Sequence, residues 1–212
     1  MKKLLAVLLS LAVLFAFAGC GSETPGETAA PTHETEAPTP VGSVIATMGT
    51  VGFELVYDRE GVILELKGFN EAGDAIAEAC QKYVGRACVH GIRGILRYAA
   101  DNQLLGDAKT FSIRVRHGDP LPEETFLETI VVDTQYLADE ECTGIRMIQL
   151  DGSHLTAEGY IDEDTAARMG SLYLQVDVTD VTVSQLSAEH TYTVTAADMT
   201  CTVGAVTGFV SK

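Results

Sequence analysis

Residues 51–69 read VGFELVYDREGVILELKGF, and their pattern gives the strongest indication of the fold. Apolar and polar side chains alternate in Val51–Tyr57 and again in Val62–Phe69, a pattern typical of β-strands that bury one face. The residues between them, Asp58–Gly61, have the composition of a tight turn that ends on a glycine. The stretch therefore predicts an antiparallel hairpin, and the apolar run Ser43–Met48 ahead of it predicts a further strand.

Two helices are predicted after this hairpin. Asp74 has a side chain suited to an N-cap, so we expect a short helix over Ala75–Tyr83. The segment Arg86–Leu105 carries apolar side chains three and four residues apart, which is the spacing of an amphipathic helix. Gly91 and Gly94 within it each lower helix propensity by about 1 kcal/mol relative to Ala. Small residues at these positions would also let the helix lie close to a sheet.

The next segments predict a strand, a helix and another strand. Phe111–Arg116 alternates apolar and polar residues, which predicts a strand with one solvent-exposed face. Pro122–Ala138 predicts a helix with the Glu123–Glu124 pair in its first turn, where the helix dipole favours carboxylates. Ile145–Leu150 predicts the last strand of this part.

The C-terminal part is rich in Thr and Val. Asp162–Met169 could form a short helix, and strands are predicted at Leu172–Val178, Thr191–Thr195 and Thr200–Val206. Together the segments predict an α+β fold, in which an antiparallel sheet has helices packed on one face and a β-rich C-terminal extension follows.

The chain begins with the layout of a secretory signal. Two lysines precede the apolar run Leu4–Phe17, which only Ser10 interrupts, and the small residues Ala18 and Gly19 lead to Cys20. The apolar run is shorter than the ~20 residues needed to cross a bilayer. A cleaved signal is therefore favoured over a permanent transmembrane helix.

The four residues Phe17-Ala18-Gly19-Cys20 resemble the lipobox of bacterial lipoproteins, although that family prefers Leu in place of Phe17. The resemblance implies cleavage before Cys20, lipidation of its thiol, and anchoring in the cell membrane by fatty acyl chains such as palmitate. Two or three chains make a durable anchor, because each buried methylene contributes about 0.8 kcal/mol. The body would then lie in the cell envelope, outside the cytoplasm. The alternative is an ordinary secretory signal with a chance cysteine.

Composition divides the chain into four predicted parts. Residues 1–19 form the lipoprotein signal peptide, and residues 20–42 form a lipidated cysteine followed by a tether rich in Thr, Glu and Pro. The tether is expected to be disordered, because it lacks the large apolar side chains that offset ordering entropy. The α+β domain is expected over residues 43–150, and the β-rich extension over residues 151–212.

The segment Ser43–Leu105 resembles the extracytoplasmic middle domain of RsgI-type anti-sigma factors. In that family an Asn-Pro-Ser-x-Glu-Leu strand leads into a hairpin and an Asn-x-x-Gly bend, and the matching positions here are Thr50–Leu55, Gly61–Ile63 and Asn70–Gly73. The resemblance implies an extracellular α+β module. Family members are similar to proteins that cleave themselves at the Asn-Pro bond; this chain has Thr-Val there, so self-cleavage is not implied. A lipoprotein signal replaces the family's sigma-binding domain and transmembrane helix, so direct sigma binding is not expected.

The formal charge of the chain is -16 at pH 7. This charge argues against nucleic acid as a partner and against close contact with anionic lipid headgroups. Trp is absent, which weakens an interpretation based on carbohydrate stacking. The charge favours solubility and leaves cationic partners and divalent ions open.

Four cysteines follow Cys20, namely Cys80, Cys88, Cys142 and Cys201. An even number outside the cytoplasm permits disulfides, and four cysteines allow three pairings. Pairing of Cys80 with Cys88 needs a turn between them, whereas pairing of Cys142 with Cys201 would tie the tail to the preceding domain. Buried free thiols are the alternative, because buried cysteine also behaves as a small apolar residue.

The sequence predicts no cofactor, no metal site and no catalytic residue. Cys88 and His90 lie two residues apart and would point in different directions on a helix, so a catalytic pair is not expected. The common zinc, redox and acyl-transfer motifs are absent. The carboxylate runs Asp139–Glu141 and Asp162–Asp164 lack the pattern of a calcium loop and are expected to be a helix end and a helix start.

We therefore expect a membrane-anchored extracytoplasmic protein that binds or senses a small ligand or an envelope protein without catalysis. One alternative is a cell-envelope hydrolase whose site is assembled only in the fold, with His117, Asp119 and Glu54 as candidate residues. Another is a structural interaction protein, in which the strand-rich segment Leu172–Val206 pairs with a partner by adding a strand at a sheet edge.

Overall fold

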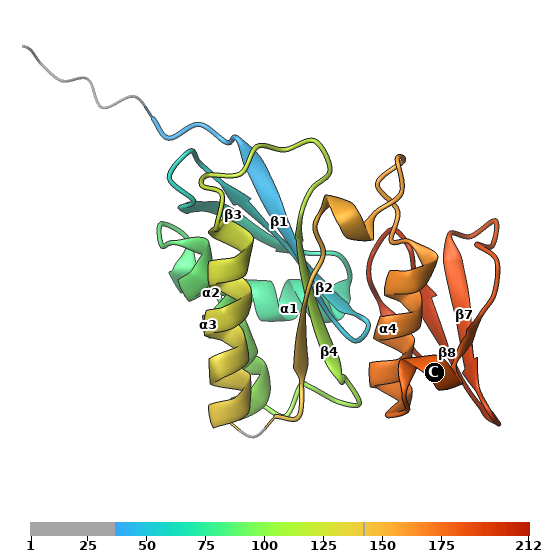
Figure 1. Ribbon diagram of the computed structural model, residues 1–212. Coiled ribbons are helices and arrows are strands. Elements are labelled where there is room, and N and C mark those ends of the chain that lie inside the picture. The colour runs from blue at the N-terminus through green and yellow to red at the C-terminus, as the bar shows by residue number, and fades with distance from the viewer. Residues whose placement is uncertain (1–36, 142) are drawn as a thin grey trace, which may run out of the picture. The chain divides into compact units, whose positions relative to one another are not determined.

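The computed structural model describes residues 37–212 except residue 142. Within this part the predicted α+β class is confirmed: a five-stranded sheet with helices is followed by a four-stranded C-terminal sheet (Figure 1). The predicted signal over residues 1–19, the lipidation site Cys20 and most of the tether lie outside the described residues. Residues 37–40 are exposed and have no regular secondary structure.

The larger sheet is built around the predicted hairpin and has the order β3-β2-β1-β4-β5. Its strands are β1 (Gly42–Met48), β2 (Val51–Tyr57), β3 (Ile63–Gly68), β4 (Thr110–Val115) and β5 (Arg146–Gln149). In the turn between β2 and β3, Asp58 Oδ1 accepts a 3.0 Å hydrogen bond from the N–H of Val62, and Gly61 has a φ of +74°. Neighbouring strands are antiparallel except β4 and β5, which run parallel because a helix returns the chain between them.

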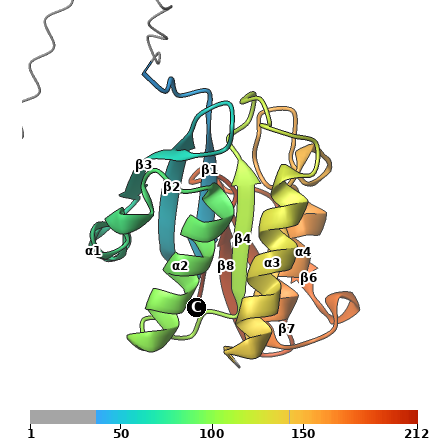
Figure 2. The same cartoon turned by 90° about the vertical axis from the view of Figure 1, so that its left-hand side faces the viewer.

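Three helices and a short 3-10 turn belong to this sheet: α1 (Glu71–Ala79), η1 (Gln81–Tyr83), α2 (Cys88–Asp101) and α3 (Phe126–Glu140). Figure 2 shows α2 and α3 across one face of the sheet, as predicted. The predicted start of α1 is wrong, because the side chain of Asn70 caps it by accepting from the N–H of Gly73. Asp74 instead accepts from the N–H of Gly68 at 3.1 Å. The predicted start of α3 is also too early, so the Glu123–Glu124 pair precedes this helix.

Close packing of α2 on the sheet depends on a glycine. A Cβ atom at Gly91 would lie 2.3 Å from Cδ1 of Ile63, so a side chain there would require Ile63 or the helix to move. The apolar residues that α2 buries beneath it are Ile92, Ile95, Leu96 and Ala99. The predicted close approach to the sheet is confirmed at Gly91, whereas Gly94 faces the side chain of Tyr83.

The other face of the larger sheet is covered as well, by the C-terminal part. Ser112 and Arg114 on β4 are buried. The Nη1 of Arg114 donates to the carbonyl of Gly159 at 3.2 Å, and its Nη2 donates to the carbonyl of Val206. The predicted solvent-exposed face of Phe111–Arg116 is therefore wrong, because a later segment supplies acceptors to its polar side chains.

The C-terminal sheet has the order β6-β7-β8-β9 and is antiparallel throughout. Its strands are β6 (Thr182–Val183), β7 (Thr191–Ala196), β8 (Met199–Gly204) and β9 (Val210–Ser211), and the nearby helical segments are η2 (Gly152–His154), α4 (Glu163–Leu174) and η3 (Val178–Asp180). The prediction of a strand at Leu172–Val178 is wrong. The side chain of Asp162 caps the start of α4, which continues to Leu174 and ends where Gln175 adopts a left-handed conformation with φ of 59°.

Residues 37–212 form one compact unit that contains two hydrophobic cores. The larger core lies between the five-stranded sheet and α1 to α3. The smaller core includes Ile148 and Leu150 from the end of the first part, together with residues of α4, β7 and β8. The N–H of Val210 on β9 also donates to the carbonyl of Gly49 at 2.9 Å. The C-terminal segment is thus packed against the larger sheet.

Candidate functional site

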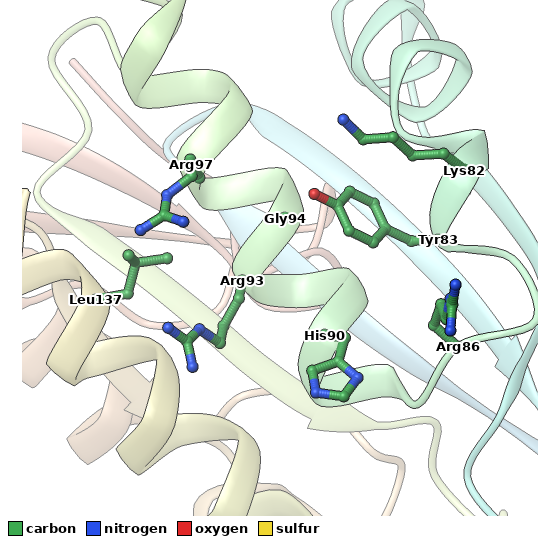
Figure 3. A pocket seen from close by; sticks show the side chains of 8 residues that line it. All are labelled: Lys82, Tyr83, Arg86, His90, Arg93, Gly94, Arg97 and Leu137. Atoms are coloured by element: carbon green, nitrogen blue, oxygen red, sulfur yellow. The ribbon is translucent and has the colours of Figure 1, made fainter.

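An open pocket of about 530 Å³ lies beside η1, α2 and α3. Its lining, shown in Figure 3, consists of Lys82, Tyr83, Arg86, His90, Arg93, Gly94, Arg97 and Leu137. Four of the fourteen lysines and arginines of the chain line this pocket, and no carboxylate is among the described lining residues. In a chain of net charge -16, the pocket is a local reversal of charge.

A stripe of basic residues along α2 and the turn before it forms most of the pocket. Arg86, His90, Arg93 and Arg97 follow one another at intervals of four, three and four residues. These intervals place side chains on one face of a helix, and the opposite face of α2 is the apolar one that packs on the sheet. The apolar spacing of this segment does not reveal the stripe. Applied to the cations, the same spacing rule would have found it.

Carboxylates on the neighbouring helix hold two of the arginines. Nη1 of Arg93 lies 2.9 Å from Oδ2 of Asp133, and Nη2 of Arg97 lies 3.1 Å from Oε1 of Glu141. Figure 3 shows both arginine side chains extending from α2 toward the side on which Leu137 lies. The two pairs orient the guanidinium groups, and each guanidinium has further N–H donors that these bonds do not use.

Tyr83 approaches α2 from the opposite side and lies against Gly94 (Figure 3). A Cβ atom at Gly94 would lie 2.1 Å from Cζ of Tyr83, so the ring occupies the space that a side chain would fill. The ammonium of Lys82 lies 5.3 Å from the centre of the same ring, within the range of a cation–π contact. Within the described part of the chain, the Tyr83 hydroxyl has no hydrogen-bond partner, so it remains available as a donor.

Lys82 and Arg86 differ from the two paired arginines. Neither forms an ion pair with any carboxylate in the described residues. Both are exposed, and Arg86 directly precedes the first turn of α2. The helix dipole adds positive potential at this end. Two unpaired cations, a free hydroxyl and a helix N-terminus therefore lie at one pocket, which is an arrangement suited to binding an anion.

No family model, curated protein or solved structure matches this chain. The functional assignment therefore depends on the geometry of the described residues.

The residues named for a hydrolase do not assemble into one site. His117 and Asp119 line a shallow pocket of about 210 Å³, and Glu54 is not among its lining residues. Oδ2 of Asp119 accepts a 2.8 Å hydrogen bond from the backbone N–H of Ser43. The side chain of His117 packs beside Gly159, where an added Cβ atom would lie 3.1 Å from Cγ of His117. Asp119 thus has a structural partner, and the structure brings only two of the three candidates together.

Glu54 lies in an ion-pair cluster on the sheet. Its side chain is only 5% exposed and pairs with Arg116, and its Oε2 lies 3.0 Å from Nζ of Lys67. Burial alone would raise the pKa of Glu54, but hydrogen bonds from Arg116 and Lys67 outweigh burial and hold the pKa below its ordinary value. Glu54 is therefore a charged structural residue, and both of its carboxylate oxygens are paired, one with Arg116 and one with Lys67.

Three of the four cysteines considered for disulfides are buried free thiols, namely Cys80, Cys88 and Cys201. Burial raises the pKa of Cys80 and of Cys201 to about 11, and that of Cys88 to about 12, so the thiols stay neutral at pH 7. Cys142 lies outside the described residues. Cys88 lies in the core, whereas His90 is exposed and lines the pocket beside α2.

Two further predictions concern metals and strand addition. Among the described residues, no group of three or more His, Cys, Asp or Glu side chains could hold a metal ion. The outer strands of the C-terminal sheet, β6 and β9, are each two residues long. A partner strand would find few backbone groups to pair with there, so the arrangement favours a pocket over an edge as the binding site.

Proposed function

We propose that this protein is an extracytoplasmic lipoprotein whose folded body binds an anionic ligand and does not transform it. One observation carries the binding proposal: four cationic side chains line a single pocket in a chain of net charge -16. Like charges in close proximity repel one another, and an anion would relieve this repulsion. The pocket offers cations and one hydroxyl donor but no nucleophile with an adjacent base, so it supports binding without catalysis.

Placement outside the cytoplasm and attachment to the membrane are part of the same proposal. Support comes from the apolar run Leu4–Phe17, the small residues after it, and the likeness of Phe17–Cys20 to a lipobox. None of the helices within the described residues has both the length and the apolar character to span a bilayer. We propose that acyl chains on Cys20 hold the protein to the membrane.

The likeness of Ser43–Leu105 to the middle domain of RsgI-type anti-sigma factors also remains a proposal. Its support is the sequence pattern quoted above together with the order of three strands, two helices and a strand over β1 to β4. We propose that the likeness extends to an extracellular sensing role, and that the pocket beside α2 is the part that receives the signal.

Titration of the full-length protein with citrate and with pyrophosphate tests the binding proposal. We expect saturable binding that weakens as salt is added, because exposed charge pairs are screened. Arg86→Gln should weaken binding of both probes, and Arg168→Gln, on α4, serves as the matched control. Failure of both citrate and pyrophosphate to bind would contradict the proposal.

Anchoring is tested separately in cells that express the full chain. We expect incorporation of labelled palmitate and recovery of the protein in the membrane fraction. Cys20→Ala should abolish the label and release the protein from that fraction. Recovery of unlabelled wild-type protein in the cytosol would contradict the proposed location, but it would leave the pocket chemistry intact.

A further inference from the structure

We propose that the pocket beside α2 selects a compact anion with two or three negative charges, such as a di- or tricarboxylate or a short phosphate chain. The inference rests on the proposed function, because it names the ligand class of the same pocket. Guanidinium groups bind carboxylate and phosphate oxygens with the same paired geometry. The shared chemistry is therefore a small cluster of anionic oxygens, whether carbon or phosphorus carries them.

The charge balance of the pocket sets the charge of the ligand. The lining contributes four positive charges from two lysine or arginine residues without carboxylate partners and two arginines that have them. The two partner carboxylates on α3 neutralise two of these charges, so 4 − 2 leaves two positive charges. A divalent anion would neutralise this excess and a trivalent one would exceed it by one charge, whereas a monovalent anion would leave one positive charge unbalanced.

The spacing of the cations sets the size of the ligand. Arg93 and Arg97 are four residues apart on α2, which corresponds to about 6 Å along a helix, or roughly one turn. A ligand with two anionic groups can contact cations on neighbouring turns, but a single small ion contacts only one. The pocket volume of about 530 Å³ falls in the range of small-molecule sites.

The surroundings of the pocket disfavour a long polyanion. Carboxylates outnumber lysines and arginines in the chain, and Glu128 is exposed on α3, the helix that contributes Leu137 to the pocket. A polyanion that extends beyond the four cations would meet these carboxylates and a protein surface of net charge -16. Repulsion outside the pocket would offset attraction within it, and for this reason a compact ligand fits better than a polymer.

The groups without internal partners indicate where the ligand lies. Arg86, Lys82 and the Tyr83 hydroxyl have unused hydrogen-bond donors at the end of the pocket near η1. Arg93 and Arg97 already donate to carboxylates but keep further N–H donors, so they can contact a second anionic group of the same ligand. We therefore place one anionic group of the ligand against the first three side chains, where it completes their hydrogen bonding.

A competition experiment on the full-length protein tests the inference with four probes at fixed ionic strength: acetate, citrate, pyrophosphate and long-chain polyglutamate. Citrate and pyrophosphate should bind at least about tenfold more tightly than acetate, and polyglutamate should bind no more tightly than citrate. Arg86→Gln and Lys82→Gln should each weaken citrate binding about three- to tenfold. Arg168→Gln should change it less than about twofold.

The outcomes separate the inference from the proposed function. Acetate binding as tightly as citrate, or polyglutamate binding more tightly, would overturn the compact ligand class while leaving an anion-binding pocket. Failure of all four probes to bind would remove the proposed function itself. Tyr83→Phe keeps the ring and removes only the hydroxyl, so it should weaken citrate binding about two- to fivefold. Unchanged affinity in that variant would overturn the position assigned to the ligand.

Discussion

Arginines on the two faces of the larger sheet have different surroundings. On the face that the C-terminal part covers, Arg114 donates to two backbone carbonyls and Arg116 pairs with the buried Glu54. On the face that the helices cover, Arg86 has no ion-pair partner among the described residues. A cation that receives its acceptors from its own chain therefore stabilises the fold. A cation without them is free to bind something else.

The largest expected effect comes from removing Arg114, whose acceptors belong to its own chain. Arg114→Ala would leave the carbonyls of Gly159 and Val206 without their donor and open a void between the sheet and the C-terminal part. We expect a loss of about 2–5 kcal/mol in the free energy of unfolding, because two carbonyls lose their hydrogen-bond donor and a void is left behind. Urea denaturation measures it. Arg168→Ala is the control and should cost less than about 0.5 kcal/mol; equal losses in the two variants would contradict the structural role of Arg114.

A smaller effect is expected from neutralising Glu54. Glu54→Gln removes the charge that Arg116 and Lys67 share and should cost about 1–3 kcal/mol at neutral pH. Because the folded-state pKa of Glu54 is lowered, its stabilisation is complete above the unfolded-state pKa and is lost as pH falls through the folded-state pKa. Unfolding measured between neutral and acidic pH should thus show a shallower loss of stability in the variant. Parallel pH profiles for the two proteins would contradict this assignment.

The hairpin shows why much of the fold could be predicted. Alternation in Val51–Tyr57 and Val62–Phe69 is local, so the strands and the turn between them follow from the sequence alone. The covered face of Phe111–Arg116 could not be predicted, since its acceptors come from Gly159 and Val206, far along the chain. The strand expected at Leu172–Val178 failed because the capped helix α4 continues into it.

The candidate site was partly within reach of the sequence. The spacing of Arg86, His90, Arg93 and Arg97 shows that they share a helix face. Which of them have an ion-pair partner depends on Asp133 and Glu141, which lie 40 and 44 positions further along the chain. The packing of α2 against α3 fixes those partners, and no local pattern in the sequence of α2 reveals this packing.

Removing one of those carboxylates should leave one more arginine of the pocket without an ion-pair partner. Asp133→Asn takes away the partner of Arg93 and raises the net charge of the pocket by one. The pair is partly exposed, so the free energy of unfolding should fall by only about 0.2–1 kcal/mol. Citrate affinity should rise about two- to fivefold, which calorimetric titration would detect. Weaker citrate binding would show that Asp133 is needed to hold Arg93 in place for the ligand.

The smallest expected change in stability comes from a substitution that alters no charge. Gly94→Ala gains about 1 kcal/mol of helix propensity, but the new Cβ must displace the Tyr83 ring, whose Cζ lies 2.1 Å from that position. These two effects oppose each other, so the net change in unfolding free energy should stay within about 0.5 kcal/mol. The displaced ring would enter the pocket and weaken citrate binding at least about threefold. Gly152→Ala, where a Cβ meets no atom within 4 Å, is the matched control. Equal citrate affinity in the two variants would mean that the ligand does not contact the Tyr83 side of the pocket, since the charges are identical in both.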